Sequence, residues 1–112
     1  MKYEVDRSNL TNIKVIATLD ILFEESIGIW VTDKPMSKKS RCLFQEQMSK
    51  TWWETEDLGR YCNHALIPNT TVVFHQNQLE LITNKPIFCG EEILVDYRKI
   101  TDYTGYIPII NF

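Results

Sequence analysis

The chain has 112 residues, of which 44% are hydrophobic, and its formal net charge is -3. A chain of this length has room for one domain with one hydrophobic core, so we expect a single domain over residues 1–112. The acidic balance argues against nucleic acid as the default partner, because phosphate contacts require a basic face, and it favours a cationic partner.

Apolar runs in the sequence are short. The longest, such as residues 72–74 and 107–110, fall far below the roughly 20 residues that a membrane span requires. The N-terminal residues lack the apolar stretch of a secretion signal. We therefore expect a soluble, intracellular protein with no membrane partner.

The cysteines and histidines are few and scattered. Cys42, Cys62 and Cys89 are widely spaced and odd in number, which favours reduced, buried thiols over a disulfide framework. With only His64 and His75 as imidazole donors, a four-ligand zinc site would need ligands from unrelated segments. We expect no bound metal.

The predicted elements are mostly short strands. In chain order, alternating or short apolar stretches predict strands over residues 12–18, 27–32, 41–45, 70–74, 79–83 and 93–97. Gln76 and Asn77 predict a hairpin loop, and residues 55–57 predict the start of a single helical turn at Leu58. No stretch predicts a long amphipathic helix, residues 19–25 being the nearest. The predicted class is mainly β.

A short pattern occurs twice. Residues 31–36 have the sequence Val-Thr-Asp-Lys-Pro-Met, and residues 82–87 have the sequence Ile-Thr-Asn-Lys-Pro-Ile. Each copy follows alternating apolar residues and precedes another predicted strand. Because proline fixes φ and lacks an amide donor, both copies predict a strand, a turn and a second strand.

Two longer motifs begin about thirty residues apart. Residues 60–69 have the sequence Arg-Tyr-Cys-Asn-His-Ala-Leu-Ile-Pro-Asn, and residues 90–97 have the sequence Gly-Glu-Glu-Ile-Leu-Val-Asp-Tyr. In order and internal spacing they resemble the SET-domain protein-lysine methyltransferases, whose motifs are Arg-Phe-x-Asn-His-Ser-Cys-x-Pro-Asn and Gly-Glu-Glu-Leu-x-Phe-Asp-Tyr. A short motif alone is weak evidence, but two long ones in order are hard to obtain by chance.

The resemblance implies a fold. SET domains are mainly β, with a β-clip arrangement of short strands and hairpins, and they contain paired strand-turn-strand units like the two copies above. Their C-terminal tail threads beneath the Asn-His loop in a pseudoknot-like crossing, an exception to the usual avoidance of threading. This chain resembles a minimal, single-domain member of the family.

The resemblance also implies a cofactor, S-adenosylmethionine, with S-adenosylhomocysteine as product. Asn63 and His64 would hold the adenosyl group through amide and backbone groups. Gly28 corresponds to the second glycine of the family's N-terminal Gly-x-Gly, and Ser26 replaces the first. The full set of implied cofactor-binding residues is Ile27, Gly28, Ile29, Arg60, Tyr61, Asn63, His64 and Tyr97.

By the same resemblance, the activity is transfer of a methyl group to a lysine ε-amine of a protein or peptide partner. Tyr97 would be the catalytic residue, because its hydroxyl would orient the neutral amine. The aliphatic lysine stem would lie in an aromatic and apolar channel formed by Tyr61, Val95, Tyr103 and Tyr106. The sequence leaves the oligomeric state open, with a homodimer possible.

Two alternatives remain. A non-catalytic SET-like module that binds a peptide or protein is suggested by Ser26 and by Ala65, which stands where the family has serine, while the retained Tyr97 argues against it. A thiol nucleophile at Cys62 with His64 as base lacks a third, orienting group.

Overall fold

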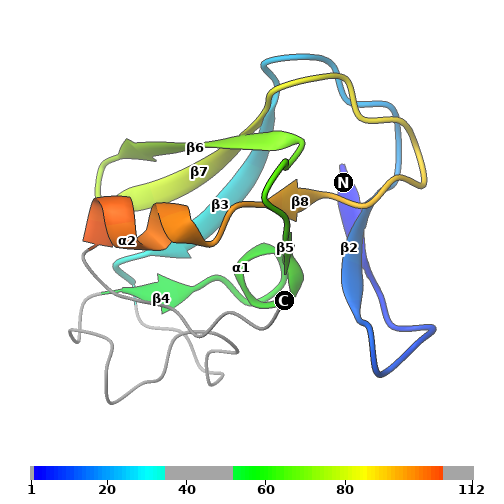
Figure 1. Ribbon diagram of the computed structural model, residues 1–112, viewed down its shortest axis with the longest axis horizontal. Helices are drawn as coiled ribbons and strands as arrows, with labels where there is room; N and C mark the ends of the chain where they lie inside the picture. The colour runs from blue at the N-terminus through cyan, green and yellow to red at the C-terminus, as the bar shows by residue number, and fades with distance from the viewer. Residues whose placement is uncertain (1, 35–51, 105–112) are drawn as a thin grey trace.

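The computed structural model describes residues 2–34 and 52–104, and this part of the chain is mainly β (Figure 1). Its strands form three small sheets, and two short helices accompany them. This agrees with the predicted class. The predicted strand over residues 41–45, the first proline turn at Pro35, and Cys42 and Tyr106 lie outside the described residues.

The largest sheet has four strands in the order β4-β3-β7-β6. All neighbouring strands in it are antiparallel. Gln76 and Asn77 connect β6 to β7 and have φ values of 50° and 59°, as a tight two-residue hairpin turn requires. The strand bounds are β3 (Ser26–Thr32), β4 (Trp53–Glu54), β6 (Thr70–His75) and β7 (Gln78–Thr83).

Two smaller sheets complete the β structure. β1 (Tyr3–Asp6) and β2 (Lys14–Ala17) form an antiparallel hairpin, which lies to one side of the main sheet in Figure 1. β5 (Asn63–His64) and β8 (Leu94–Val95) form a short parallel pair. The strand predicted over residues 93–97 is therefore shorter than expected.

The two helices are α1 (Leu58–Tyr61) and α2 (Arg98–Thr104). The predicted helical turn at Leu58 is confirmed. Its capping contact comes from the Thr55 hydroxyl, which accepts a hydrogen bond from the Gly59 amide at 2.7 Å and donates to the Ile29 carbonyl at 2.8 Å. Residues 19–25, the nearest candidate for a helix, contain no helix.

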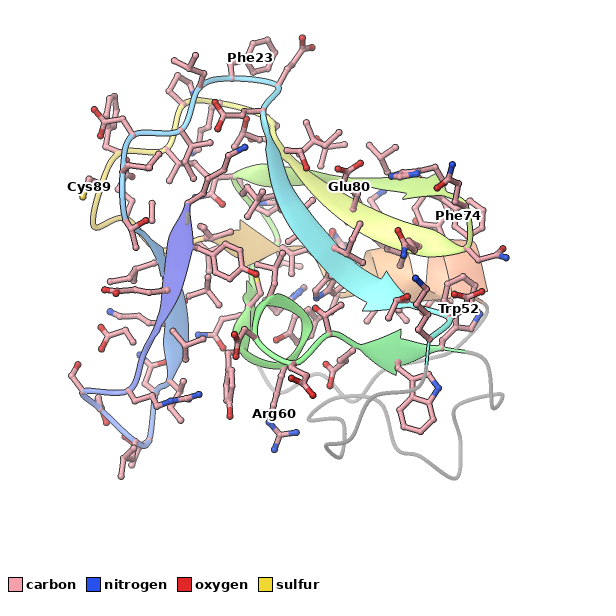
Figure 2. All side chains as sticks on the ribbon, turned by 180° about the vertical axis from the view of Figure 1, so that it is seen from behind. Phe23, Trp52, Arg60, Phe74, Glu80 and Cys89 are labelled. Carbon is pink, nitrogen blue, oxygen red and sulfur yellow. The ribbon has the colours of Figure 1, made fainter. Side chains whose placement is uncertain are left out.

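The core lies between the main sheet, α1 and the β5–β8 pair. Trp30, at the centre of β3, is fully buried and stacks on Tyr97 with a centroid distance of 6.2 Å. The other fully buried large side chains are Val15, Ile21, Val31, Leu58, Leu79, Leu81, Ile87, Ile93, Val95 and Ile100. Cys62 is buried as expected, but Cys89 is exposed on the loop between β7 and β8, which corrects the expectation of a buried thiol there (Figure 2).

Candidate functional site

The two long motifs lie side by side through the parallel pair of β5 and β8. Asn63 is paired with Leu94 and His64 with Val95, and the Ala65 amide donates to the Val95 carbonyl at 3.0 Å. The structure thus brings together the Asn-His residues and the strand that leads to Tyr97.

Asn69 holds the same strand from a second direction. Its side-chain amide donates to the Glu92 carbonyl at 2.8 Å, and its Oδ1 accepts from the Leu94 amide at 2.9 Å. The hydroxyl of Thr70 donates to the Leu94 carbonyl at 2.7 Å. The second motif is therefore hydrogen-bonded to two parts of the first motif, β5 and Asn69. The threading of the C-terminal tail stays a prediction, since residues 105–112 lie outside the described part.

Tyr97 follows β8 and is 7% exposed. Its hydroxyl donates to the Cys62 carbonyl at 2.6 Å, and its backbone amide donates to Nδ1 of His64 at 2.9 Å. The rings of His64 and Tyr97 are 5.1 Å apart. The hydroxyl proton is directed to Cys62, and a phenolic oxygen that donates in this way also has lone pairs with which it can accept.

His64 is held as a neutral imidazole. Burial lowers its pKa below the usual value, the positive charge of Arg98 adds to this effect, and the carboxylate of Asp96 opposes it. Since Nδ1 accepts from the Tyr97 amide, the ring proton resides on Nε2. Asp96 itself accepts from the Arg98 guanidinium through both oxygens, and these bonds lower the pKa of Asp96.

Asn63 connects three segments. Its Nδ2 donates to the Ile13 carbonyl at 3.1 Å and to the Glu92 carboxylate at 2.9 Å. Glu91 is exposed, whereas Glu92 is half-buried. Glu92 is drawn inward because it accepts the Asn63 donor. The side-chain amide of Asn63 therefore anchors the loop to the segments that immediately precede β2 and β8.

Gly28 lies on β3 with φ +155°, in a conformation that favours glycine, next to a break in the register between β3 and β7. A Cβ at this position would lie 3.4 Å from Leu58 Cδ2 and 3.8 Å from the Tyr3 ring. The space beside this backbone is therefore narrow and lacks a side chain of its own. Such a cradle fits a group that must approach the backbone closely, as the resemblance implies for S-adenosylmethionine.

The remaining implied cofactor residues lie on β3 and on α1. Ile27 is buried and Ile29 half-buried on β3. The ring centroid of Tyr61 is 4.7 Å from Cζ of Arg7 and 5.6 Å from Cζ of Arg60, and Arg60 Nε donates to the Tyr61 hydroxyl. Figure 2 shows Arg60 pointing away from the main sheet.

The implied lysine channel is only partly described. Val95 is fully buried in β8. Tyr103, on α2, stacks on Phe74 at 5.8 Å and borders a cavity of about 350 Å³, whose lining also includes Thr70, Val72, Asn84, Asp96 and Lys99. Tyr103 contacts Phe74, and its hydroxyl lies 3.5 Å from the Val72 carbonyl, so a common channel with Tyr61 and Val95 stays a prediction.

No role was predicted for Asn69, Glu92 or Tyr3. The fixed spacing of Asn69 within the first motif could have indicated its role. Nothing in the sequence indicated that Glu92 pairs with Asn63. Tyr3, whose hydroxyl approaches the space beside Gly28, belongs to a strand that was not predicted, and burial raises the pKa of its phenol.

Comparison with known families decides the assignment of the fold. The family model of the SET domain matches residues 3–98. The chain belongs to the SET-domain family. Proteins of this family are generally methyltransferases that use S-adenosylmethionine. No curated protein matches the chain.

A solved structure agrees with the assignment. The chain is similar to the crystal structure of a "putative histone methyltransferase" of Plasmodium falciparum, with a TM-score of 0.58 and 22% sequence identity. The match covers 86% of this chain and 92% of the other. At this level of identity the likeness concerns the fold, and the expected SET fold class is confirmed. Neither helix of the described residues is long and apolar enough to cross a membrane.

Proposed function

We propose that this protein is an S-adenosylmethionine-dependent protein-lysine N-methyltransferase and that Tyr97 is its catalytic residue. The observation that carries the proposal is the double fixation of Tyr97, through its hydroxyl to Cys62 and through its amide to His64. Both partners belong to the first motif and Tyr97 ends the second. A catalytic group fixed by its neighbours needs little rearrangement when a substrate arrives.

S-adenosylmethionine supplies a methyl group whose S–C bond breaks as the lysine N–C bond forms, sulfur keeping the electron pair and the amine proton leaving to water. For its part, the chain must align a neutral amine. The Tyr97 oxygen directs its proton to Cys62 and therefore offers lone pairs to an amine N–H. Trp30 and the ring of His64 pack against Tyr97 and reduce the access of water.

A lysine amine is normally protonated near neutral pH, so the site must favour its neutral form. His64, kept neutral by burial, adds no positive charge beside Tyr97 but also no negative charge that would stabilise an ammonium. Asp96 is the nearest described carboxylate in sequence, and its charge is engaged by Arg98. These features support an environment that does not hold the lysine as a cation.

For the cofactor, the residues that we assign are Ile27, Gly28 and Ile29 on β3, Arg60 and Tyr61 on α1, Asn63 and His64 on β5, and Tyr97. Support comes from the backbone at Gly28, whose φ of +155° favours glycine and leaves β3 without a side chain at this point. We assign the lysine stem to Tyr61, Val95, Tyr103 and Tyr106. The partner is a protein or peptide that bears a lysine, and histones are a first candidate.

A non-catalytic SET-like binding module is the second candidate. Ser26 and Ala65 favour it because both depart from the family motif. The thiol alternative loses support, since the Cys62 thiol donates to the Ile93 carbonyl at 3.3 Å and Nδ1 of His64 accepts from Tyr97.

A methyl-transfer assay tests the proposal. The protein is incubated with methyl-labelled S-adenosylmethionine and with core histones or lysine-containing basic peptides, and the label in the protein fraction is counted. Transfer that disappears when each lysine of a responding peptide is replaced by arginine supports the proposal. Binding of S-adenosylhomocysteine without transfer to any of these substrates would favour the non-catalytic module.

A further inference from the structure

Ser26, which stands where the family has glycine, is the centre of a polar cluster at the start of β3. Its hydroxyl donates to Oε2 of Glu80 on β7 at 2.5 Å. The other carboxylate oxygen, Oε1, lies 2.8 Å from Nε2 of His75 on β6. Glu80 therefore connects β3, β7 and β6, which run side by side where Figure 2 labels it.

The backbone of Ser26 is held as well. The ammonium group of Lys2 donates to the Ser26 carbonyl at 2.6 Å and forms an ion pair with Glu25 at 2.9 Å. The hydroxyl and the carbonyl of Ser26 thus each have a charged partner. Hydrogen bonds to charged groups are stronger than neutral ones, so both contacts restrict this residue.

These contacts restrict Ser26 at a point where the pairing of β3 with its neighbour β7 is irregular. The register between β3 and β7 shifts between Ser26 and Gly28, so the regular ladder is interrupted there. Gly28 contributes no side chain, and glycine loses more conformational freedom on ordering than other residues. Contacts at Ser26 are therefore needed to define the path of the next two residues.

We propose that Ser26, held by Glu80 and Lys2, is a positioning residue that fixes the Ile27–Gly28 backbone against the cofactor. This inference rests on the proposed function. The serine that replaces the family's glycine would then compensate for the interrupted pairing of β3 with β7. Its bond to Glu80 would supply the order that regular ladder bonds would otherwise give. Ser26 itself acts through Gly28 and does not take part in the chemistry.

The central test is Ser26→Gly, which restores the residue of the family motif. If Ser26 is merely a tolerated replacement, this variant binds the cofactor as well as the wild type does, or better. If Ser26 positions the backbone, the dissociation constant of S-adenosylhomocysteine, measured by calorimetry, rises about tenfold, because binding must then order roughly one further backbone residue. KM for S-adenosylmethionine rises in parallel, while kcat at saturation stays within about twofold.

Two further variants and one control sharpen the test. Ser26→Thr keeps the hydroxyl and suits a strand, so it should restore wild-type affinity. Glu80→Gln keeps an acceptor but removes the charge, so it should weaken binding less than Ser26→Gly does. Thr11→Val removes a hydroxyl bond of similar length, to Asn9 at 2.7 Å in the turn after β1, and should leave the affinity unchanged.

Amide hydrogen exchange of the cofactor-free protein gives a readout that does not depend on activity. Ser26→Gly should accelerate exchange at Ile27 and Gly28 and leave β6 unaffected. Wild-type affinity for S-adenosylhomocysteine in Ser26→Gly would overturn the inference and leave the proposed function standing. A loss of affinity in Thr11→Val equal to that in Ser26→Gly would do the same. A wild-type protein that does not bind S-adenosylhomocysteine would overturn both.

Discussion

Nδ1 of His64 accepts a hydrogen bond from the backbone amide of Tyr97 at 2.9 Å, across 33 positions of the chain. The bond requires an unprotonated Nδ1 and joins the two motifs at the point where β8 ends. Protonation of His64 would place two donors opposite each other, and burial already disfavours the charged imidazole.

The stability of the protein should therefore depend on pH below neutrality. The pKa of His64 is lower in the folded state than its usual value of 6.5, so the unfolded chain binds more protons in the window just below 6.5. The free energy of unfolding should fall as the pH decreases through this window, by less than about 1.4 kcal/mol per pH unit for one group.

Denaturant titrations between pH 5 and 7.5 measure this slope. His64→Asn, which offers an oxygen acceptor near the position of Nδ1 and does not titrate, should reduce it. The lowered carboxyl pKa values of Glu25, Glu80 and Asp96 act at the acid end of this range and below it, and both proteins contain these carboxyl groups, so the comparison of the two slopes reports on His64. An identical slope in wild type and His64→Asn would contradict the assignment of a buried, neutral His64.

Asn69 should contribute strongly to stability. Asn69→Ala removes both bonds to the second motif and leaves the Glu92 carbonyl and the Leu94 amide without their partner. The expected loss is about 2–3 kcal/mol, because unsatisfied buried groups are costly. Asn84→Ala is the matched control, since Nδ2 of Asn84 also bridges two carbonyls but the residue is exposed. Equal losses in urea titrations would show that the bridge of Asn69 is not special.

Asn63 and Glu92 should be energetically coupled. Asn63→Asp removes the donor to the Ile13 carbonyl and places a second carboxylate beside Glu92, so the loop should be destabilised. Glu92→Gln should recover part of the loss by removing the charge repulsion. A double-mutant cycle on the melting temperature measures the coupling, and strictly additive effects would refute the contact.

Gly59 should tolerate no side chain. A Cβ there would overlap the Trp30 carbonyl oxygen and lie 2.8 Å from the Thr55 hydroxyl that caps α1. Gly59→Ala should cost about 3 kcal/mol or more, because the obstacle is backbone. Gly90→Ala is the control, with φ +89° but open space around it, and should cost about 1 kcal/mol from strain alone. A smaller loss at Gly59 than at Gly90 would contradict the packing of α1 on β3.

Some elements of the fold could be predicted from the sequence because their residues show a clear local pattern, and others could not because they show none. β6 and β7 were predictable because alternating residues flank a two-residue turn at Gln76 and Asn77. α2 was not, since this short helix buries Ile100 but shows no sustained amphipathic period. Residues 19–25 include several apolar side chains but form no helix. Two of these side chains, Leu22 and Phe23, are exposed, so apolar content alone was a misleading signal there.

The site divides in the same way. Motif order and spacing predicted that residues 60–69 and 90–97 belong together, and the β5–β8 pairing places them so. The contacts that join them were not predictable, because the bond from Tyr97 to Cys62 depends on the path of the backbone and not on the side chain of Cys62. The cluster of Ser26, Glu80 and His75 likewise requires the strand order β3-β7-β6, which no local pattern specifies.

The most direct test of the central claim is the single-turnover rate of methyl transfer to a lysine-containing peptide by the wild type and by Tyr97→Phe, with melting temperatures recorded on the same samples. Tyr97→Phe removes the bond to the Cys62 carbonyl, so it should lower the stability by about 1–2 kcal/mol. Below the melting transition, the rate per folded molecule should fall roughly 100-fold, while the affinity for S-adenosylhomocysteine stays nearly unchanged. A variant that loses stability but transfers methyl at the wild-type rate would show that Tyr97 is a core residue and contradict the account.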